Sequence, residues 1–90
     1  MNTTDQIERL LRENFEVEYL EIQDNSHLHA GHAEAQKSGG GHYGVIICSP
    51  AFDDLPLIQR HRLVNKALQE LMPEHIHALA IKAFSPEELS

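Results

Sequence analysis

Residues 42–50 of the chain read HYGVIICSP. A short run that is nearly all apolar at its centre is typical of a strand buried on most of its surface. Pro50 ends the run because proline has no N–H to donate to a strand ladder. We therefore predict a strand over residues 42–49.

A second strand is predicted upstream, over residues 16–24 (EVEYLEIQD), where acidic residues alternate with branched and aromatic ones. The alternation slips between Tyr19 and Leu20, so either a bulge or a two-sided strand fits. The two strands should pair antiparallel, with residues 25–41 (NSHLHAGHAEAQKSGGG) as a loop at one end. A loop of this length in a small domain is usually functional or disordered. Its histidines favour function.

The chain before the first strand predicts a helix over about Thr4–Asn14. Thr3 and Gln6 have the spacing of a capping box. The expected buried face follows one-face helical spacing and comprises Ile7, Leu10, Leu11 and Phe15.

A second helix is predicted after residue 53 or 54, with Asp53 or Asp54 as its cap and Pro56 in its first turn. Its apolar stripe comprises Leu57, His61, Val64, Leu68 and Leu71. The side chains expected off that stripe are Arg60, Arg62, Lys66 and Glu70. Pro73 should end the helix.

A third strand is predicted over residues 76–84 (IHALAIKAF). Ser85, Pro86 and Glu88 then form another capping-box start, for about one helical turn. The element order is α-β-β-α-β with a short helical tail. We predict one α+β domain over residues 1–90, with helices packed on one face of a three-stranded sheet.

The composition and net charge exclude several classes of protein and partner. The 90 residues are 41% hydrophobic and 23% charged, as in folded domains. A net charge of -7 disfavours nucleic acid as a default partner. A single cysteine excludes an internal disulfide. Apolar runs are too short for a membrane span and the N-terminus lacks an apolar signal region, so we expect a cytoplasmic protein without a membrane partner.

The histidines are the main candidate functional side chains in this sequence. His27, His29 and His32 are spaced in a way that permits metal binding without fixing its geometry, so they are either metal ligands or solvated side chains. His77 should share a strand face with Leu79 and Ile81, where it is either a packed ring or a ligand. The ring of His61 should be partly buried in the helix.

Other candidate groups have weaker support. Cys48 should be a buried, unreactive thiol. Residues 41–44 spell GxxG but open a strand, so we read the match as chance. Arg60, Arg62 and Lys66 form either a solvated helix face or a phosphate contact. No catalytic motif is present, and the sequence predicts no enzyme.

Five short motifs together resemble the BolA family, over nearly the whole chain and in the same order. They are residues 24–26 (DNS) followed by His29, His42-Tyr43, Phe52 followed by residues 60–64 (RHRLV), residues 76–81 (IHALAI), and residues 85–88 (SPEE).

The resemblance implies a KH-like fold of the second topological type and a role as a non-enzymatic adaptor in iron–sulfur trafficking or iron regulation. BolA-like proteins pair with monothiol glutaredoxins and share a [2Fe-2S] cluster, to which the glutaredoxin and glutathione supply thiolates. The family's histidine ligands correspond to His77 and, best, to His29. His27 and His32 are alternates or a separate weak metal site. Alone, the chain should be a monomer or weak dimer.

Two other functions remain open. Some bacterial BolA proteins regulate transcription in stress response and cell morphology by binding DNA, which here would use Arg60, Arg62 and Lys66. A plain metal-binding module would use His27, His29 and His32.

Overall fold

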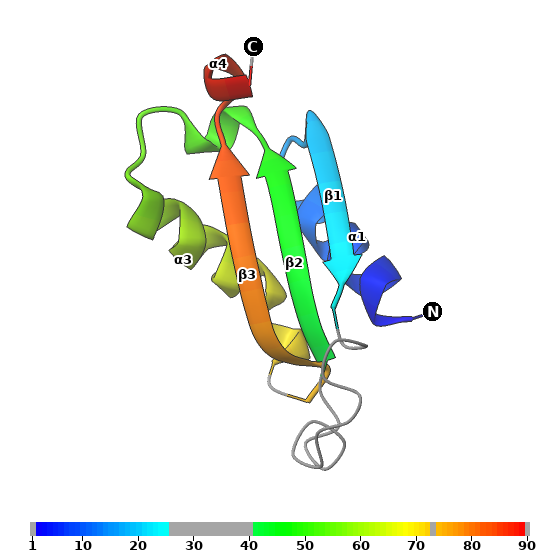
Figure 1. Cartoon of the computed structure of the whole chain (residues 1–90). Helices are drawn as coiled ribbons and strands as arrows, with labels where there is room; N and C mark the ends of the chain where they lie inside the picture. The colour runs from blue at the N-terminus through cyan, green and yellow to red at the C-terminus, as the bar shows by residue number, and fades with distance from the viewer. Residues whose placement is uncertain (1, 26–40, 73, 90) are drawn as a thin grey trace.

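The computed structural model describes residues 2–25, 41–72 and 74–89. Its elements follow the predicted order, with two short 3-10 turns added (Figure 1). They are α1 (Thr3–Asn14), β1 (Tyr19–Asp24), β2 (Gly41–Cys48), η2 (Pro50–Phe52), α3 (Leu57–Leu68), η3 (Gln69–Leu71), β3 (Ile76–Phe84) and α4 (Pro86–Leu89). The predicted α+β fold class is confirmed.

The three strands form one mixed sheet with β2 in the middle. β1 pairs antiparallel with β2, as predicted, and its register runs without a break, so the slip at Tyr19 produces no bulge. β3 pairs parallel with β2. The crossover from β2 to β3 is made by α3, the kind of connection that a parallel pair requires.

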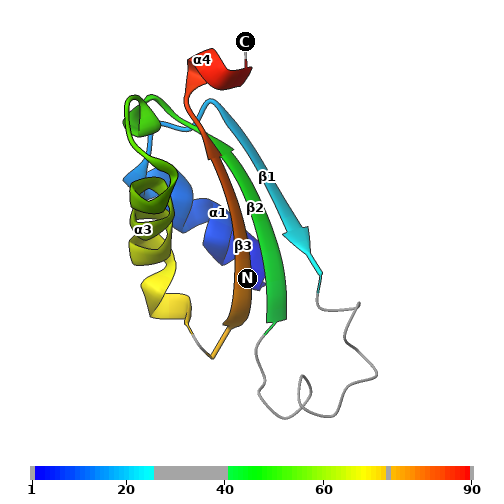
Figure 2. The ribbon, with the colours of Figure 1, turned by 60° about the vertical axis from the view of Figure 1, so that its left-hand side comes forward.

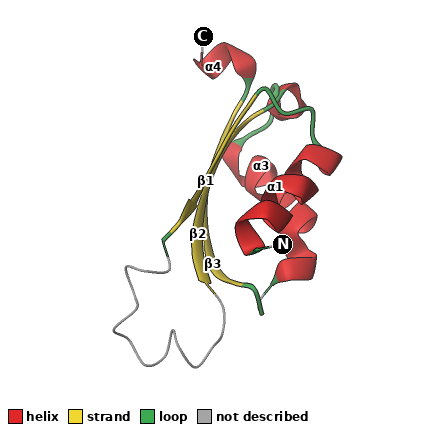
Figure 3. Ribbon diagram, turned by 90° about the vertical axis from the view of Figure 1, so that its right-hand side faces the viewer, coloured by secondary structure: helices red, strands yellow, loops and turns green. Residues whose placement is uncertain are grey.

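Both long helices cover the same face of the sheet (Figure 3). The strands direct their apolar side chains toward this face, where Val45 and Ile47 of β2 meet Ile7 and Leu11 of α1 and Val64 of α3. In the described residues the opposite face carries no helix. None of the described helices has the length and apolar character needed to cross a bilayer.

The start of α1 differs from the prediction by one residue. Asn2, not Thr3, caps the helix, because the Asn2 side chain accepts a hydrogen bond from the N–H of Asp5 at 2.8 Å. Thr3 is already the first helical residue. Asparagine is at least as good a cap as threonine, so the earlier residue takes the role.

The start of α3 differs more. Pro56 takes the N-cap position and no side chain caps the helix, so the predicted cap by Asp53 or Asp54 is wrong. Leu57 is 63% exposed although it lies on the predicted stripe. The first turn of α3 lies beyond the edge of β3, and only the later turns pass behind the sheet (Figures 1 and 2). Arg60 is buried instead.

Candidate functional site

β3 carries one residue more than β2 at its start. Gly41 pairs with Ile76 and His42 pairs with Ala78, so His77 has no partner in the register. Ile76 is 1% exposed and Leu79 packs against the core. Residues three apart fall on opposite faces of a regular strand. The bulge at His77 supplies the extra residue that lets both side chains face the core.

The bulge leaves His77 exposed beside His42. Their ring centroids are 5.6 Å apart and the ring planes are inclined by 55°. His42 is half-buried and precedes the inward-facing Tyr43, so it lies on the open face of the sheet. The prediction that His77 shares the face of Leu79 and Ile81 is therefore wrong, and His77 is not a packed core ring.

The backbone around this pair is held by hydrogen bonds. The N–H of Asn25 donates to the carbonyl of His42 at 2.7 Å, and the N–H of Gly41 donates to the carbonyl of His75 at 3.2 Å. Asn25 and Gly41 flank the segment that contains His27, His29 and His32, three predicted ligands that lie outside the described residues. Asn25 and Gly41 thus lie beside the histidine pair.

The donor set at this end of the sheet is made of imidazole. Within residues 2–25, 41–72 and 74–89, no three histidine, cysteine or acidic side chains are grouped closely enough to hold a metal ion. Imidazole suits zinc, copper, iron and nickel. The pair could therefore supply two ligands, and any further ligand must come from the remaining segment, water or another molecule.

Cys48 does not belong to this site. It lies six residues along β2 from His42, or about 20 Å in an extended strand. The thiol is 3% exposed, as predicted. Its pKa is raised, chiefly by burial and further by the negative charges of Glu18, Asp53 and Glu88. A buried thiol with a raised pKa is a poor nucleophile and a poor ligand.

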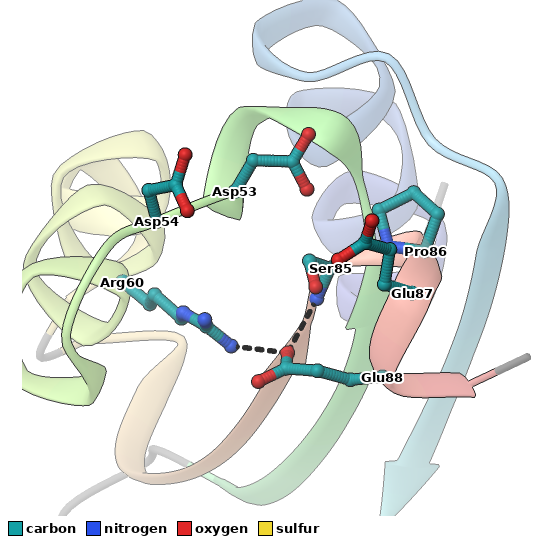
Figure 4. Close-up of a pocket in the computed structure, with 7 residues that line it drawn as sticks. All are labelled: Asp53, Asp54, Arg60, Ser85, Pro86, Glu87 and Glu88. Carbon is teal, nitrogen blue, oxygen red and sulfur yellow. Dashed lines mark hydrogen bonds and ion pairs between the residues drawn. The ribbon is translucent and has the colours of Figure 1, made fainter.

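The other end of the sheet is organised around the guanidinium of Arg60 (Figure 4). Arg60 Nε donates to the carbonyl of Leu55 at 2.8 Å, and Nη1 donates to the carbonyl of Ala83 at 3.0 Å. Nη1 also donates to Glu88 Oε1 at 2.6 Å. The same Glu88 oxygen accepts from the N–H of Ser85 at 2.7 Å, which is one of the two hydrogen bonds of the predicted capping box of α4. The N–H of Glu88 donates to the backbone carbonyl of Ser85 at 3.1 Å.

Arg60 is therefore a structural residue at the edge of the core. It is 6% exposed, and it lies four residues before Val64 on the face of α3 that packs against the sheet. The placement of Arg60 off the apolar stripe is wrong. Arg62 and Lys66 are exposed, as predicted, and His61 is half-buried. The helical spacing of Arg60 with Val64 and Leu68 is the signal that places Arg60 on this face, and the Ala83 carbonyl, a tertiary partner, accounts for the burial of its charge.

The hollow around Arg60 is acidic. It measures about 400 Å³, and its lining includes the carboxylates of Asp53, Asp54, Glu87 and Glu88. The hydrogen bond from Arg60 and that from the backbone of Ser85 hold the pKa of Glu88 below its ordinary value. The surplus of negative charge makes this end of the sheet unsuited to phosphate.

Comparison with known proteins identifies the family. A family model described as BolA-like protein matches residues 11–88. The chain belongs to the BolA family. It is 33% identical over 82 residues to the DNA-binding transcriptional regulator BolA of Haemophilus influenzae, a match that covers 91% of this chain and 76% of that protein. The solved structure of BolA1 from Arabidopsis thaliana is 33% identical and superposes with a TM-score of 0.82, covering 98% of this chain and 96% of that one.

A third BolA relative is a larger protein. The chain is 41% identical over 86 residues to SufE-like protein 1, chloroplastic/mitochondrial, of Arabidopsis thaliana. The match covers 91% of this chain but spans only 23% of that protein. BolA-like sequence thus occurs both in chains of about this length and as one part of a longer chain.

Removal of the Arg60 side chain should destabilise the fold. We expect Arg60→Ala to lower the free energy of unfolding by about 2–3 kcal/mol, since a buried carbonyl, a part-buried carbonyl and a carboxylate lose a charged donor. Arg62→Ala, two residues away and exposed, should change it by less than about 0.5 kcal/mol. Urea unfolding followed by circular dichroism measures both. Equal effects of the two substitutions would contradict the assignment of Arg60 to the core.

The ion pair between Arg60 and Glu88 should make stability depend on pH in a defined direction. Because the pKa of Glu88 is lowered from its ordinary 4.5, its carboxylate stabilises the fold above that pH and stops doing so as the pH falls through the lowered value. Glu88→Gln should therefore be less stable than the unmodified chain at neutral pH, with a difference in the free energy of unfolding that closes as the pH falls below 4.5 and through the lowered pKa of Glu88. Glu70→Gln, exposed on η3, controls for the loss of one acidic charge. A gap that stays constant with pH would refute the role of the Glu88 charge.

Proposed function

We propose that this BolA-family chain is a non-enzymatic adaptor that pairs with a monothiol glutaredoxin and supplies histidine ligands to a [2Fe-2S] cluster shared with that partner and glutathione. The observation that carries the proposal is the exposed His77, which the bulge in β3 turns out of the core and places beside a second imidazole. The sequence motifs imply that the family acts in iron–sulfur trafficking or iron regulation, and an exposed histidine ligand fits that role.

The donor chemistry of the chain fits a shared cluster. Iron–sulfur clusters take four protein or small-molecule ligands, and Rieske centres show that two histidines can replace two cysteines. The single cysteine of this chain is buried away from His77, so thiolates must come from the partner and from glutathione. When bound, a cluster with imidazole ligands carries less negative charge and has a higher reduction potential than one with four thiolates.

The second histidine ligand in this proposal is His29. His29 is the fourth residue after Asn25, whose N–H is bonded to the backbone of His42. Covalent geometry alone therefore keeps the His29 backbone within about 14 Å of that anchor. His27 lies within the same reach and His32 within a longer one, so these two are the alternates.

The decisive experiment is anaerobic reconstitution of the chain with a monothiol glutaredoxin, glutathione, iron and sulfide. We expect a heterodimer whose visible absorption and circular dichroism differ from those of the glutaredoxin homodimer. His77→Ala should abolish the heterodimer spectrum, and His29→Ala should weaken it or change its shape. His61→Ala, on α3 behind the other face of the sheet, should leave it unchanged.

Binding and ligation are scored separately in that experiment. Size-exclusion chromatography reports whether the two proteins co-elute, and far-ultraviolet circular dichroism reports whether each variant is folded. Retention of the full heterodimer spectrum in a folded His77→Ala variant would refute the ligand role of His77. A homodimer spectrum with no co-elution would refute the adaptor function itself.

DNA binding is the second candidate, because relatives from Haemophilus influenzae and Vibrio cholerae are named DNA-binding transcriptional regulators. The residues left for phosphate contact are Arg62 and Lys66, which lie one turn apart on the exposed side of α3. The net charge of -7 opposes this function.

If DNA were bound through those two side chains, the affinity for a duplex should fall roughly tenfold between 50 and 200 mM salt, as counterion release at two phosphates requires. The double substitution Arg62→Ala/Lys66→Ala should remove that salt dependence, whereas Lys82→Ala, on the sheet, should not. Fluorescence anisotropy of a labelled duplex measures both, and binding that shows no dependence on salt would exclude this candidate.

A further inference from the structure

His42 and His77 bring two metal-ligating side chains from neighbouring strands together on the open face of the sheet. We infer that these two imidazoles form a site for one divalent transition-metal ion, which the chain binds by itself with no glutaredoxin present. The inference goes beyond the proposed function, which concerns a cluster shared between two proteins and gives His42 no role.

The spacing of the two rings suits ligation of a single ion. An imidazole nitrogen binds zinc at about 2.0–2.1 Å, which places the centres of two rings on one tetrahedral ion roughly 5 Å apart. The observed separation is 5.6 Å, so a small rotation of either side chain closes the difference. The planes are inclined by 55° rather than stacked, so the in-plane lone pairs of the two rings lie in planes that intersect.

The backbone holds both residues in place before any ion arrives. His77 is fixed by the bulge, because Ile76 before it and Leu79 after it are both packed on the core side. His42 is fixed from both sides, since its carbonyl accepts from Asn25 and its register partner is Ala78. Two histidines whose backbone is already placed lose less backbone entropy on binding an ion than two histidines on a flexible segment would.

The imidazole nitrogens of the pair determine which metal ions it prefers. Neutral nitrogen donors favour copper, nickel and zinc over calcium or magnesium, and among these divalent ions copper binds most tightly. The described residues add no third donor, so the remaining coordination positions are left to water or to an added ligand. We therefore assign the pair to an open copper- or zinc-type site rather than to a closed structural one.

Copper(II) titration of the 90-residue chain tests the inference. The chain used carries His27→Ala, His29→Ala and His32→Ala, so that binding by those three histidines does not mask the pair. Affinity is measured against a competing chelator, and electron paramagnetic resonance reports nitrogen ligation. Nuclear magnetic resonance of the same samples locates the ion, because copper(II) broadens the signals of nearby residues.

We expect one copper ion per chain, nitrogen ligation, and broadening centred on His42, His77 and Ala78 that spares α3. Loss of a residue that only orients a metal ligand typically costs about 10–100-fold in affinity, so His42→Ala and His77→Ala should each cost at least about tenfold. The matched controls are His61→Ala, on α3 behind the sheet, and His75→Ala, one residue before β3 begins. Each should change the affinity less than about twofold.

Three results would overturn the inference: unchanged affinity in folded His42→Ala and His77→Ala variants, broadening centred elsewhere, or a loss in His75→Ala as large as that in His42→Ala. None of them bears on the cluster experiment, because no partner, glutathione or sulfide is present. Conversely, a failed reconstitution with glutaredoxin leaves the copper titration decisive for the pair.

Discussion

A three-stranded sheet with helices on one face must turn nearly all its apolar side chains toward that face, and the rest of this structure depends on that constraint. β1 and β2 meet it by regular alternation, which turns Leu20 and Ile22 of β1 and Val45 and Ile47 of β2 toward the helices. β3 cannot, because Ile76 and Leu79 are both needed in the core and lie an odd number of residues apart. The bulge resolves the conflict, and its by-product is an exposed His77 next to His42. The candidate site is thus a consequence of core packing.

The need to pack against one face of the sheet also applies to α3, where it buries the charged side chain of Arg60. The face of α3 that packs on the sheet includes Arg60, and a buried guanidinium is tolerated only when it is hydrogen-bonded and paired. Two carbonyls and the Glu88 carboxylate meet that requirement. The ion pair ties α4 to α3 across the end of β3, so the last turn of the described chain is held by the core rather than by its own short helix.

Sequence alone predicted the fold better than the site. Helical and strand periodicities placed every long element to within a few residues, because they report one-sided burial directly. They could not place Arg60, since an arginine in a helical stripe is indistinguishable from an exposed one until the Ala83 carbonyl is known. The bulge did leave a signal, the odd spacing of Ile76 and Leu79, which strict alternation overlooks. The contact of His42 with His77 depends on the register between β2 and β3, which no local pattern contains.

The two ends of the sheet offer different chemistry to a partner. The end with the histidine pair presents two imidazole side chains, and the single cysteine of the chain is buried elsewhere. The Arg60 end presents surplus carboxylates around an arginine that is already hydrogen-bonded. A site with two protein donors is incomplete for any ion or cluster that takes four ligands. The remaining ligands must therefore come from outside the described residues, and their identity determines whether the site holds a single ion or a cluster. Water would leave a simple metal site, whereas thiolates from a second protein would make ligation and partner binding a single event.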